Sequence, residues 1–186
     1  IGSETLGQTV GSTFNNKNVG TGKTVTVNSI TLANGSNGGL ATNYSISPGQ
    51  TSTANVTAKA LTATVSTANK VYDSTTLANT TLTLSCLIGS ETLGQSVTAA
   101  FNNKNVGTGK TVTISAITLS DGSNGGLASN YTISAGQTTT ANITAKALTV
   151  SGITASNKTY DGNTVATLDL TGTSYSGLVS GDDLSI

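Results

Sequence analysis

The chain contains no tryptophan, methionine, histidine or arginine, and it has one cysteine and one proline in 186 residues. A single cysteine excludes an intramolecular disulfide, and without histidine the material for hydrolase triads and zinc sites is almost absent. Eight lysines balance eight carboxylates, so the chain offers no basic surface to nucleic acid or to an anionic membrane. No apolar run approaches the length of a membrane span. We therefore expect no nucleic-acid partner, no membrane insertion, no cofactor and no bound metal.

The residues that are abundant point to β-structure. Serine and threonine make up almost a third of the chain and alternate with Val, Ile, Leu and Ala over short stretches. A period of two is the pattern of a half-buried strand, and a disordered Ser/Thr-rich linker would lack it. Threonine and valine are also β-branched, and such side chains suit a pleated, half-buried surface. The sequence therefore predicts an all-β protein without amphipathic helices.

A tandem repeat with a period of 87 residues runs through the chain. The string IGSETLGQ at residues 1–8 returns letter for letter at 88–95, and FNNKNVGTGKTVT at 14–26 returns at 101–113. Between residues 1–61 and the matching stretch that ends at residue 148, 47 of 61 positions are identical. A fixed period of this length predicts consecutive copies of one domain-sized module.

The sequence begins and ends inside a module. The string Asn69–Asp73 returns as Asn157–Asp161 at an offset of 88, so one residue has been inserted between them. We interpret residues 1–61 as the C-terminal half of one repeat unit, 62–148 as a complete unit and 149–186 as the N-terminal half of a further unit. Either the sequence is a window of a longer repetitive protein, or the half-units of neighbouring chains complete each other head to tail in a fibre.

Six or seven short strands are expected in the complete unit, separated by turn clusters. The expected strands are 61–65, 80–84, 96–101, 110–114, 131–133 and 139–145. The apolar residues change parity between Ile114 and Ile117, so a bulge near Ser115 is needed to return them to the core. Phe101 and Tyr131 are expected to be the only large core residues. This pattern predicts tandem immunoglobulin-like antiparallel β-sandwich repeats of about 87 residues in a rod.

The joint between successive units is the main candidate site. Only three residues separate the last expected strand of the complete unit from the first strand of the next, so we expect neighbouring units to brace each other. The residues expected at this inter-unit junction are Lys59, Leu61, Lys146 and Leu148. A covalent alternative is a Lys–Asn isopeptide crosslink beside a buried acid. The candidates for that chemistry are Lys59, Lys146, Asp73 and Asp161.

Other polar motifs are interpreted structurally. Asp161 and Asp121 lie on glycine-containing turns and resemble calcium ligands, but calcium needs six to eight oxygens, so we interpret both as Asx-turns. The adjacent pair Asp182 and Asp183 would point apart on a strand or turn and does not suit general acid–base work. Cys86 is expected to be a small buried or partly buried side chain near a strand end. We therefore find no candidate catalytic residue and expect no enzyme activity.

Three strings, in order along a unit, resemble the YDG-type repeat, a relative of the "mostly β, glycine-rich" modules. They are NKTYDGNT at 157–164, KNVGTGKTVT at 104–113 and TANITAKAL at 140–148. Such repeats occur in very large bacterial secreted surface exoproteins, including filamentous-haemagglutinin-like adhesins exported by two-partner secretion. The resemblance implies an extracellular location at a bacterial cell surface, and it supplies no catalytic residues. One departure is Ser74, where the third unit has Gly162, which leaves the local turn type open.

The leading hypothesis is a non-catalytic structural segment of a secreted extracellular adhesin stalk or filament. Its partners would be adjacent repeats of the same protein and, in a fibre, neighbouring chains. One alternative is an adhesin module that binds carbohydrate or a host protein, although aromatic residues for sugar stacking are few and Tyr175 is the first place to look. The second alternative is a subunit that polymerises head to tail by completing split β-domains in trans. The host or environmental ligand is not identified.

Overall fold

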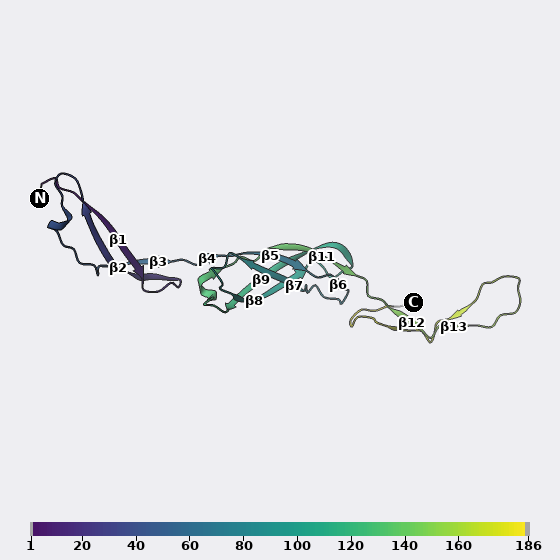
Figure 1. Cartoon of the computed structure of the whole chain (residues 1–186). Helices are drawn as coiled ribbons and strands as arrows, with labels where there is room; N and C mark the ends of the chain where they lie inside the picture. The colour runs from purple at the N-terminus through teal and green to yellow at the C-terminus, as the bar shows by residue number, and fades with distance from the viewer. Residues whose placement is uncertain (1, 185–186) are drawn as a thin grey trace. The chain divides into compact units, whose positions relative to one another are not determined.

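Figure 1 shows the computed structural model of the chain, which describes residues 2–184. The prediction of an all-β protein is confirmed, because strands and two short 3-10 helices, Ala41–Asn43 and Ala128–Asn130, account for the regular structure. In this described part of the chain, no helix has the length and apolar character needed to cross a membrane. Residues 1, 185 and 186, at the outer ends of the two predicted half-units, lie outside the described residues.

The strands, in chain order, are β1 Leu6–Phe14, β2 Gly20–Asn34, β3 Thr51–Val56, β4 Lys59–Ala60, β5 Thr62–Thr67, β6 Lys70–Val71, β7 Thr80–Ser85, β8 Leu93–Phe101, β9 Gly107–Asp121, β10 Tyr131–Thr132, β11 Thr138–Thr144, β12 Thr149–Ser151, β13 Thr154–Ala155, β14 Leu168–Asp169 and β15 Ser174–Ser176. They belong to two compact units. The first unit comprises residues 2–61, 86–94 and 120–133, and the second comprises 62–85, 95–119 and 134–184. The division between the two units therefore runs through the middle repeat.

The first unit contains a three-stranded antiparallel sheet in the order β1-β2-β3. Gly11 pairs with Ser29 and Ser12 pairs with Val27, so Asn28 bulges out of the ladder. Asn28 occupies the repeat position of Ser115, where the change of hydrophobic parity required a bulge. The predicted break is thus confirmed in the first repeat. It allows one long strand to keep its apolar residues on a single face on both sides of the bulge.

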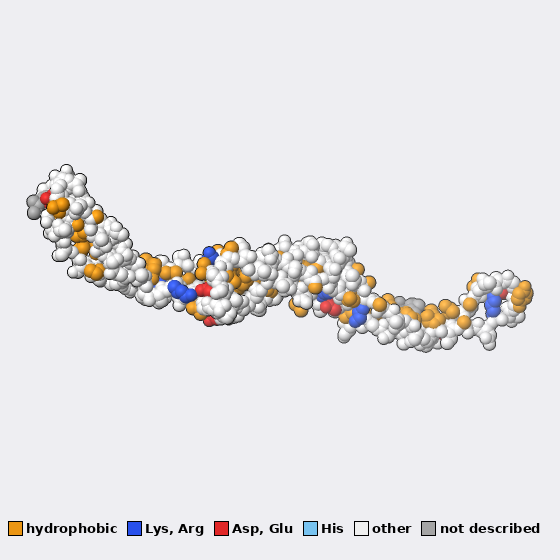
Figure 2. Space-filling view, in the orientation of Figure 1, with side chains coloured by type: hydrophobic (Ala, Val, Ile, Leu, Met, Phe, Trp, Pro, Cys, Tyr) orange, Lys and Arg blue, Asp and Glu red, His pale blue; other side chains and the backbone are white. Residues whose placement is uncertain are grey.

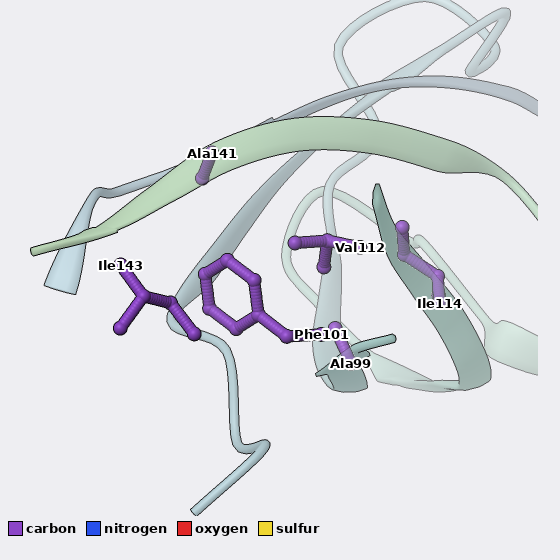
Figure 3. Close-up of a cluster of buried hydrophobic side chains, with 6 residues drawn as sticks. All are labelled: Ala99, Phe101, Val112, Ile114, Ala141 and Ile143. Carbon is purple, nitrogen blue, oxygen red and sulfur yellow. The ribbon is translucent and has the colours of Figure 1, made fainter. Parts of the chain in front are cut away.

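The second unit contains a sheet in the order β6-β11-β9-β8 and a hairpin of β5 with β7. Its buried cluster, drawn in Figure 3, comprises Ala99, Phe101, Val112, Ile114, Ala141 and Ile143. The Phe101 ring, 3 % exposed, lies between the side chains of Ile143 and Val112 in this view. Val112 and Ile114 are fully buried, as their inward parity predicted. Burial of a side chain such as Ile143 contributes roughly 1.5–3 kcal/mol, so this small cluster carries much of the stability of the unit.

The expectation of purely antiparallel strands is wrong in two places. β4 runs parallel to β10, and β6 runs parallel to β11. Both unexpected strands are two residues long, so they carry no measurable alternation and were not predicted. Parallel neighbours need a long crossover between them, and 70 residues lie between β4 and β10 and 66 between β6 and β11. The other expected strands of the complete unit are present as β5, β7, β8, β9 and β11.

Candidate functional site: the junction between successive repeats

The segment that leaves the first repeat adds a strand to the second repeat. Lys59 of β4 lies opposite Tyr131 of β10, and Ala60 lies opposite Thr132. The Leu61 N–H then donates a 2.8 Å hydrogen bond to the Thr132 carbonyl oxygen. Leu61, the only residue between β4 and β5, is 6 % exposed. The linking segment is therefore held by backbone hydrogen bonds and by burial, and both sides of this contact lie in the first compact unit.

A second contact comes from the hairpin loop that joins β1 to β2. The backbone N–H of Val19 donates to Asn130 Oδ1 over 2.9 Å, and Asn130 Nδ2 donates to Asn18 Oδ1 over 3.1 Å. Asn130 ends the second 3-10 helix, immediately before β10. One amide side chain thus accepts and donates at the same time, and this pairing fixes both its orientation and the position of the loop.

Lys23 holds that loop in shape from inside. Its side chain is among the few buried polar ones, with the residue 8 % exposed. The ammonium donates to the backbone oxygens of Asn16 and Asn18 and to the Asn16 side-chain oxygen. A buried charge is tolerated only where it is fully hydrogen-bonded, and here three loop oxygens satisfy it. The loop therefore presents Val19 to the next repeat in a defined conformation.

The third contact is electrostatic. Lys17 Nζ lies 3.0 Å from Glu91 Oε1, and the Tyr131 hydroxyl donates a 2.5 Å hydrogen bond to Glu91 Oε2. The Ile88 N–H donates in turn to the Tyr131 hydroxyl oxygen over 3.2 Å. The hydrogen bond from Tyr131, followed by the Lys17 ammonium, lowers the pKa of the Glu91 carboxyl. The same hydrogen bond to Glu91 raises the pKa of Tyr131 above its ordinary value, so the carboxylate and the neutral phenol reinforce each other.

These contacts surround a cleft of 290 Å³ in the first compact unit. The residues that line it are Lys17, Val19, Val56, Thr57, Lys59, Ile88, Glu91, Asn130 and Tyr131. A cleft of 230 Å³ in the second unit is lined by Tyr72, Val106, Ala145, Lys146, Leu148, Gly177, Leu178, Val179 and Asp182. The walls of the two clefts correspond along the repeat: Val19 to Val106 and Lys59 to Lys146 at an offset of 87, Ile88 to Val179 and Glu91 to Asp182 at 91. Four positions of the repeat thus line both clefts.

The structure places two of the four predicted junction residues at these contacts and the other two in the wall of the second cleft. Lys59 and Leu61 belong to the segment that pairs with the second repeat, and Lys146 and Leu148 line the second cleft. The side chains that make the polar contacts, however, were missed by sequence reasoning. They are Lys17, Asn18, Glu91 and Asn130. The only available signal was that these residues are the same in both repeats, and most other positions are also the same in both.

The two acids considered for a crosslink are each held by a nearer lysine. Asp73 Oδ1 lies 2.7 Å from Lys70 Nζ and accepts the Thr75 N–H over 2.9 Å. These two bonds, the one from Lys70 being the stronger cause, lower the pKa of Asp73 to about 2. Asp161 pairs in the same way with Lys158 over 2.7 Å. Among the described residues, no hydrogen bond or ion pair joins either acid to Lys59 or Lys146.

The lysine of the Asn-Lys-x-Tyr-Asp string closes the loop that follows it. Lys70 Nζ donates to the Thr75 and Leu77 carbonyl oxygens and lies 5.7 Å from the centre of the Phe101 ring. A cation above an aromatic face adds an electrostatic attraction to the packing. The local turn that was left open is left-handed in both repeats, because Ser74 has φ 63° where Gly162 has φ 76°.

Two expectations about single residues need comment. Cys86 follows β7 as expected but is exposed, so the prediction of burial is wrong. Its φ of 74° and the 98° of Gly177 at the same repeat position both lie in the left-handed region. The Asx-turn at Asp161 is confirmed by its 3.1 Å bond from the Asn163 N–H. Asp121 instead accepts the Ala128 N–H over 2.7 Å and closes a longer loop.

Tyr175, the residue considered for carbohydrate stacking, is half-buried in the hairpin of β12 with β15, opposite Val150.

The fold and the junction together define a class: an all-β protein of tandem repeats in which one repeat contributes a strand and a loop to the next. The model of the YDG domain matches residues 1–54, 57–141 and 144–186, and the chain therefore belongs to the YDG domain family. Searches of the curated proteins and of the solved structures returned no match.

Proposed function

We propose that the chain is a non-catalytic structural segment of an extracellular stalk or filament, part of a secreted adhesin at a bacterial cell surface. The observation that carries the proposal is the junction, where strand pairing, the Asn130 amide and the Lys17–Glu91 ion pair act on one joint. A chain whose copies are joined by strand pairing, an amide side chain and an ion pair is suited to transmitting force and setting length. Its partners would be adjacent repeats and, in a fibre, neighbouring chains.

In this proposal each complete repeat is an immunoglobulin-like sandwich, and successive repeats are stacked in a rod. Short connections support the stacking: two residues separate β3 from β4, and one buried residue separates β4 from β5. A linker of Gly and Ser would behave as a flexible coil, whereas a linker paired as a strand has lost that freedom. Solenoid-like arrays with nearest-neighbour contacts gain stability with each added repeat.

Small-angle X-ray scattering tests this proposal on the chain and on longer versions in which residues 62–148 are duplicated once or twice. The maximum dimension should grow by a constant increment with each duplication, while the cross-sectional radius stays unchanged. Growth with the square root of repeat number would contradict a rod. The variant Lys17→Glu should bend the joint, and Lys17→Glu with Glu91→Lys should restore it. Lys104→Glu, at the same repeat position as Lys17, provides the matched control.

A further inference from the structure

The first repeat exposes an apolar sheet face, and the equivalent face of the second repeat is buried. Phe14 of β1 is 40 % exposed, whereas Phe101, at the same repeat position in β8, is 3 % exposed. Val10 is 50 % exposed, whereas its counterpart Val97 packs against the buried cluster. The sheet β1-β2-β3 is thus the equivalent of β8-β9-β11 with its apolar face uncovered. An exposed face of this kind marks a site that another segment covers.

The covering segment in the second repeat is visible in the same structure. Residues 62–85 supply it: Val65 of β5 and Tyr72 pack against the buried cluster. Lys70 pairs with Ile143 in the parallel ladder of β6 with β11, and its ammonium lies over Phe101. Leu77 forms a bridge to Ala100 of β8. These contacts give a residue-by-residue template for how the face is closed.

Residues 149–177 repeat this covering segment with its apolar side chains exposed. Ile153 and Tyr160, at the repeat positions of the packed residues Val65 and Tyr72, are 46 % and 93 % exposed, whereas Val165 is 74 % exposed, close to the 70 % of its counterpart Leu77. The loop that follows Lys158 is nevertheless already formed, because Lys158 Nζ donates to the carbonyl oxygens of Asn163 and Val165, each at a distance of 3.0 Å. Hydrophobic side chains gather on the visible surface over the β1–β2 hairpin and over the hairpins near the C-terminus (Figure 2). Residues 149–177 are thus pre-organised as a covering segment, and the apolar face of the sheet β1-β2-β3 is uncovered.

We propose that residues 149–177 of one copy of this chain close the sheet β1-β2-β3 of a second copy, in the register of the complete repeat. Lys158 would pair with Val56, as Lys70 pairs with Ile143. Its ammonium would then lie over Phe14, and Val165 would bridge to Thr13 as Leu77 does to Ala100. The contact joins two different surfaces, so it is heterologous and leads to head-to-tail chains or rings. Strand addition to a sheet edge supplies the hydrogen bonds, and the apolar side chains fill the open face.

This inference goes beyond the proposed stalk, which requires only covalently joined repeats. The alternative occupant is a segment of a longer protein that precedes residue 1 and carries the same letters. The two occupants differ in one property: closure by a second copy depends on the concentration of this chain, and it requires residues 149–177.

Sedimentation velocity of the chain over a thousandfold range of concentration tests the proposal. We expect the weight-average mass to rise from 18.4 kDa in multiples of that value. Phe14→Asp removes the acceptor, and Tyr160→Asp with Val165→Asp removes the donor; all three side chains are at least 40 % exposed, so the folded monomer is retained. Each variant alone should stay at 18.4 kDa, with an apparent dissociation constant raised at least about tenfold.

Mixing the two variants makes the test directional. The Phe14→Asp copy keeps its donor and the Tyr160→Asp/Val165→Asp copy keeps its acceptor, so an equimolar mixture should form a dimer and nothing larger. A wild-type chain that stays monomeric throughout overturns the proposal. Association that survives in both variants, or a mixture that stays monomeric, overturns it as well. None of these outcomes alters the junction contacts of Lys17 and Glu91, so the scattering test above is judged separately.

Discussion

The Tyr131 hydroxyl donates a 2.5 Å hydrogen bond to the Glu91 carboxylate, and each of these two residues also binds the preceding repeat. The backbone of Tyr131 pairs with Lys59, and Glu91 receives Lys17. One buried phenol and one carboxylate therefore connect the strand contact to the charged contact. Damage to this pair should loosen both contacts together, because the hydrogen bond joins the residue that receives Lys17 to the residue that pairs with Lys59.

Tyr131→Phe should lower the denaturant midpoint of the first compact unit. The substitution leaves the 6 %-exposed ring in place but removes the donor to Glu91 and the acceptor of the Ile88 N–H. Tyr44→Phe is the matched control: Tyr44 makes a 2.8 Å hydrogen bond to Glu4 but is 40 % exposed. Equilibrium urea unfolding of both variants measures the difference. Equal shifts in the two midpoints would show that the hydrogen bond at the junction stabilises the chain no more than the exposed one does.

Phe101→Ala should destabilise the second compact unit by about 3–5 kcal/mol, the usual cost of removing a buried aromatic side chain. Phe14→Ala removes the same side chain from an exposed position and should cost less than about 1 kcal/mol. The comparison requires dilute protein, at which the chain is monomeric. Chemical unfolding followed by circular dichroism gives both values, and similar costs would contradict the assignment of the open face.

Ser74→Gly should stabilise the second unit by about 0.5 kcal/mol. A residue other than glycine in the left-handed conformation costs roughly 1–2 kcal/mol, and glycine removes this cost. Glycine also raises the entropy of the unfolded chain, which offsets part of the stabilisation. The φ of 63° at Ser74 is the conformation that Gly162 adopts at the same repeat position. Gly162→Ser should destabilise the hairpins of residues 149–184. A thermal-unfolding scan of each variant suffices, and destabilisation by Ser74→Gly would mean that the serine side chain has a role in the loop.

Asp73 should make the stability of the second unit sensitive to acid. Its pKa in the folded chain is about 2, because Lys70 and the Thr75 amide stabilise the carboxylate, while an unfolded aspartate titrates near about 3.9. A lowered pKa contributes stability that is fully present above the unfolded value and is lost as the pH falls towards 2. Asp73→Asn should therefore flatten the dependence of the urea midpoint between about pH 4 and pH 2. Carbon-detected NMR titration of the Asp73 carboxyl checks the value directly; a titration near 4 would remove the basis of the prediction.

The strands were predictable because each long one has many residues over which to alternate. Val112, Ile114 and Phe101 followed from parity, and the bulge followed from the point at which parity changes. β4 and β6 were not predictable, since two residues have no period and parallel pairing is set by distant chain. Cys86 was misjudged because a cysteine is usually buried, whereas here it lies exposed at a left-handed position after β7.

The candidate site was predictable only in its backbone. The short connection placed Lys59 and Leu61 at the joint, because a chain without slack must contact its neighbour. Lys17 and Glu91 are 74 residues apart, and their meeting depends on how the hairpin loop is oriented. Identical letters in two repeats do not single out such residues, since the surrounding positions are identical as well.

Amide hydrogen exchange at the joint tests the central claim, that one repeat contributes an ordered strand and loop to the next. The Leu61 and Val19 amides donate to Thr132 and Asn130, so NMR should find both protected. The amides of Leu148 and Val106, at the same repeat positions, find no such acceptor within residues 2–184 and serve as the internal reference. We predict that Leu61 and Val19 exchange at least about tenfold more slowly than their counterparts. Equal exchange rates within the two pairs would contradict the account.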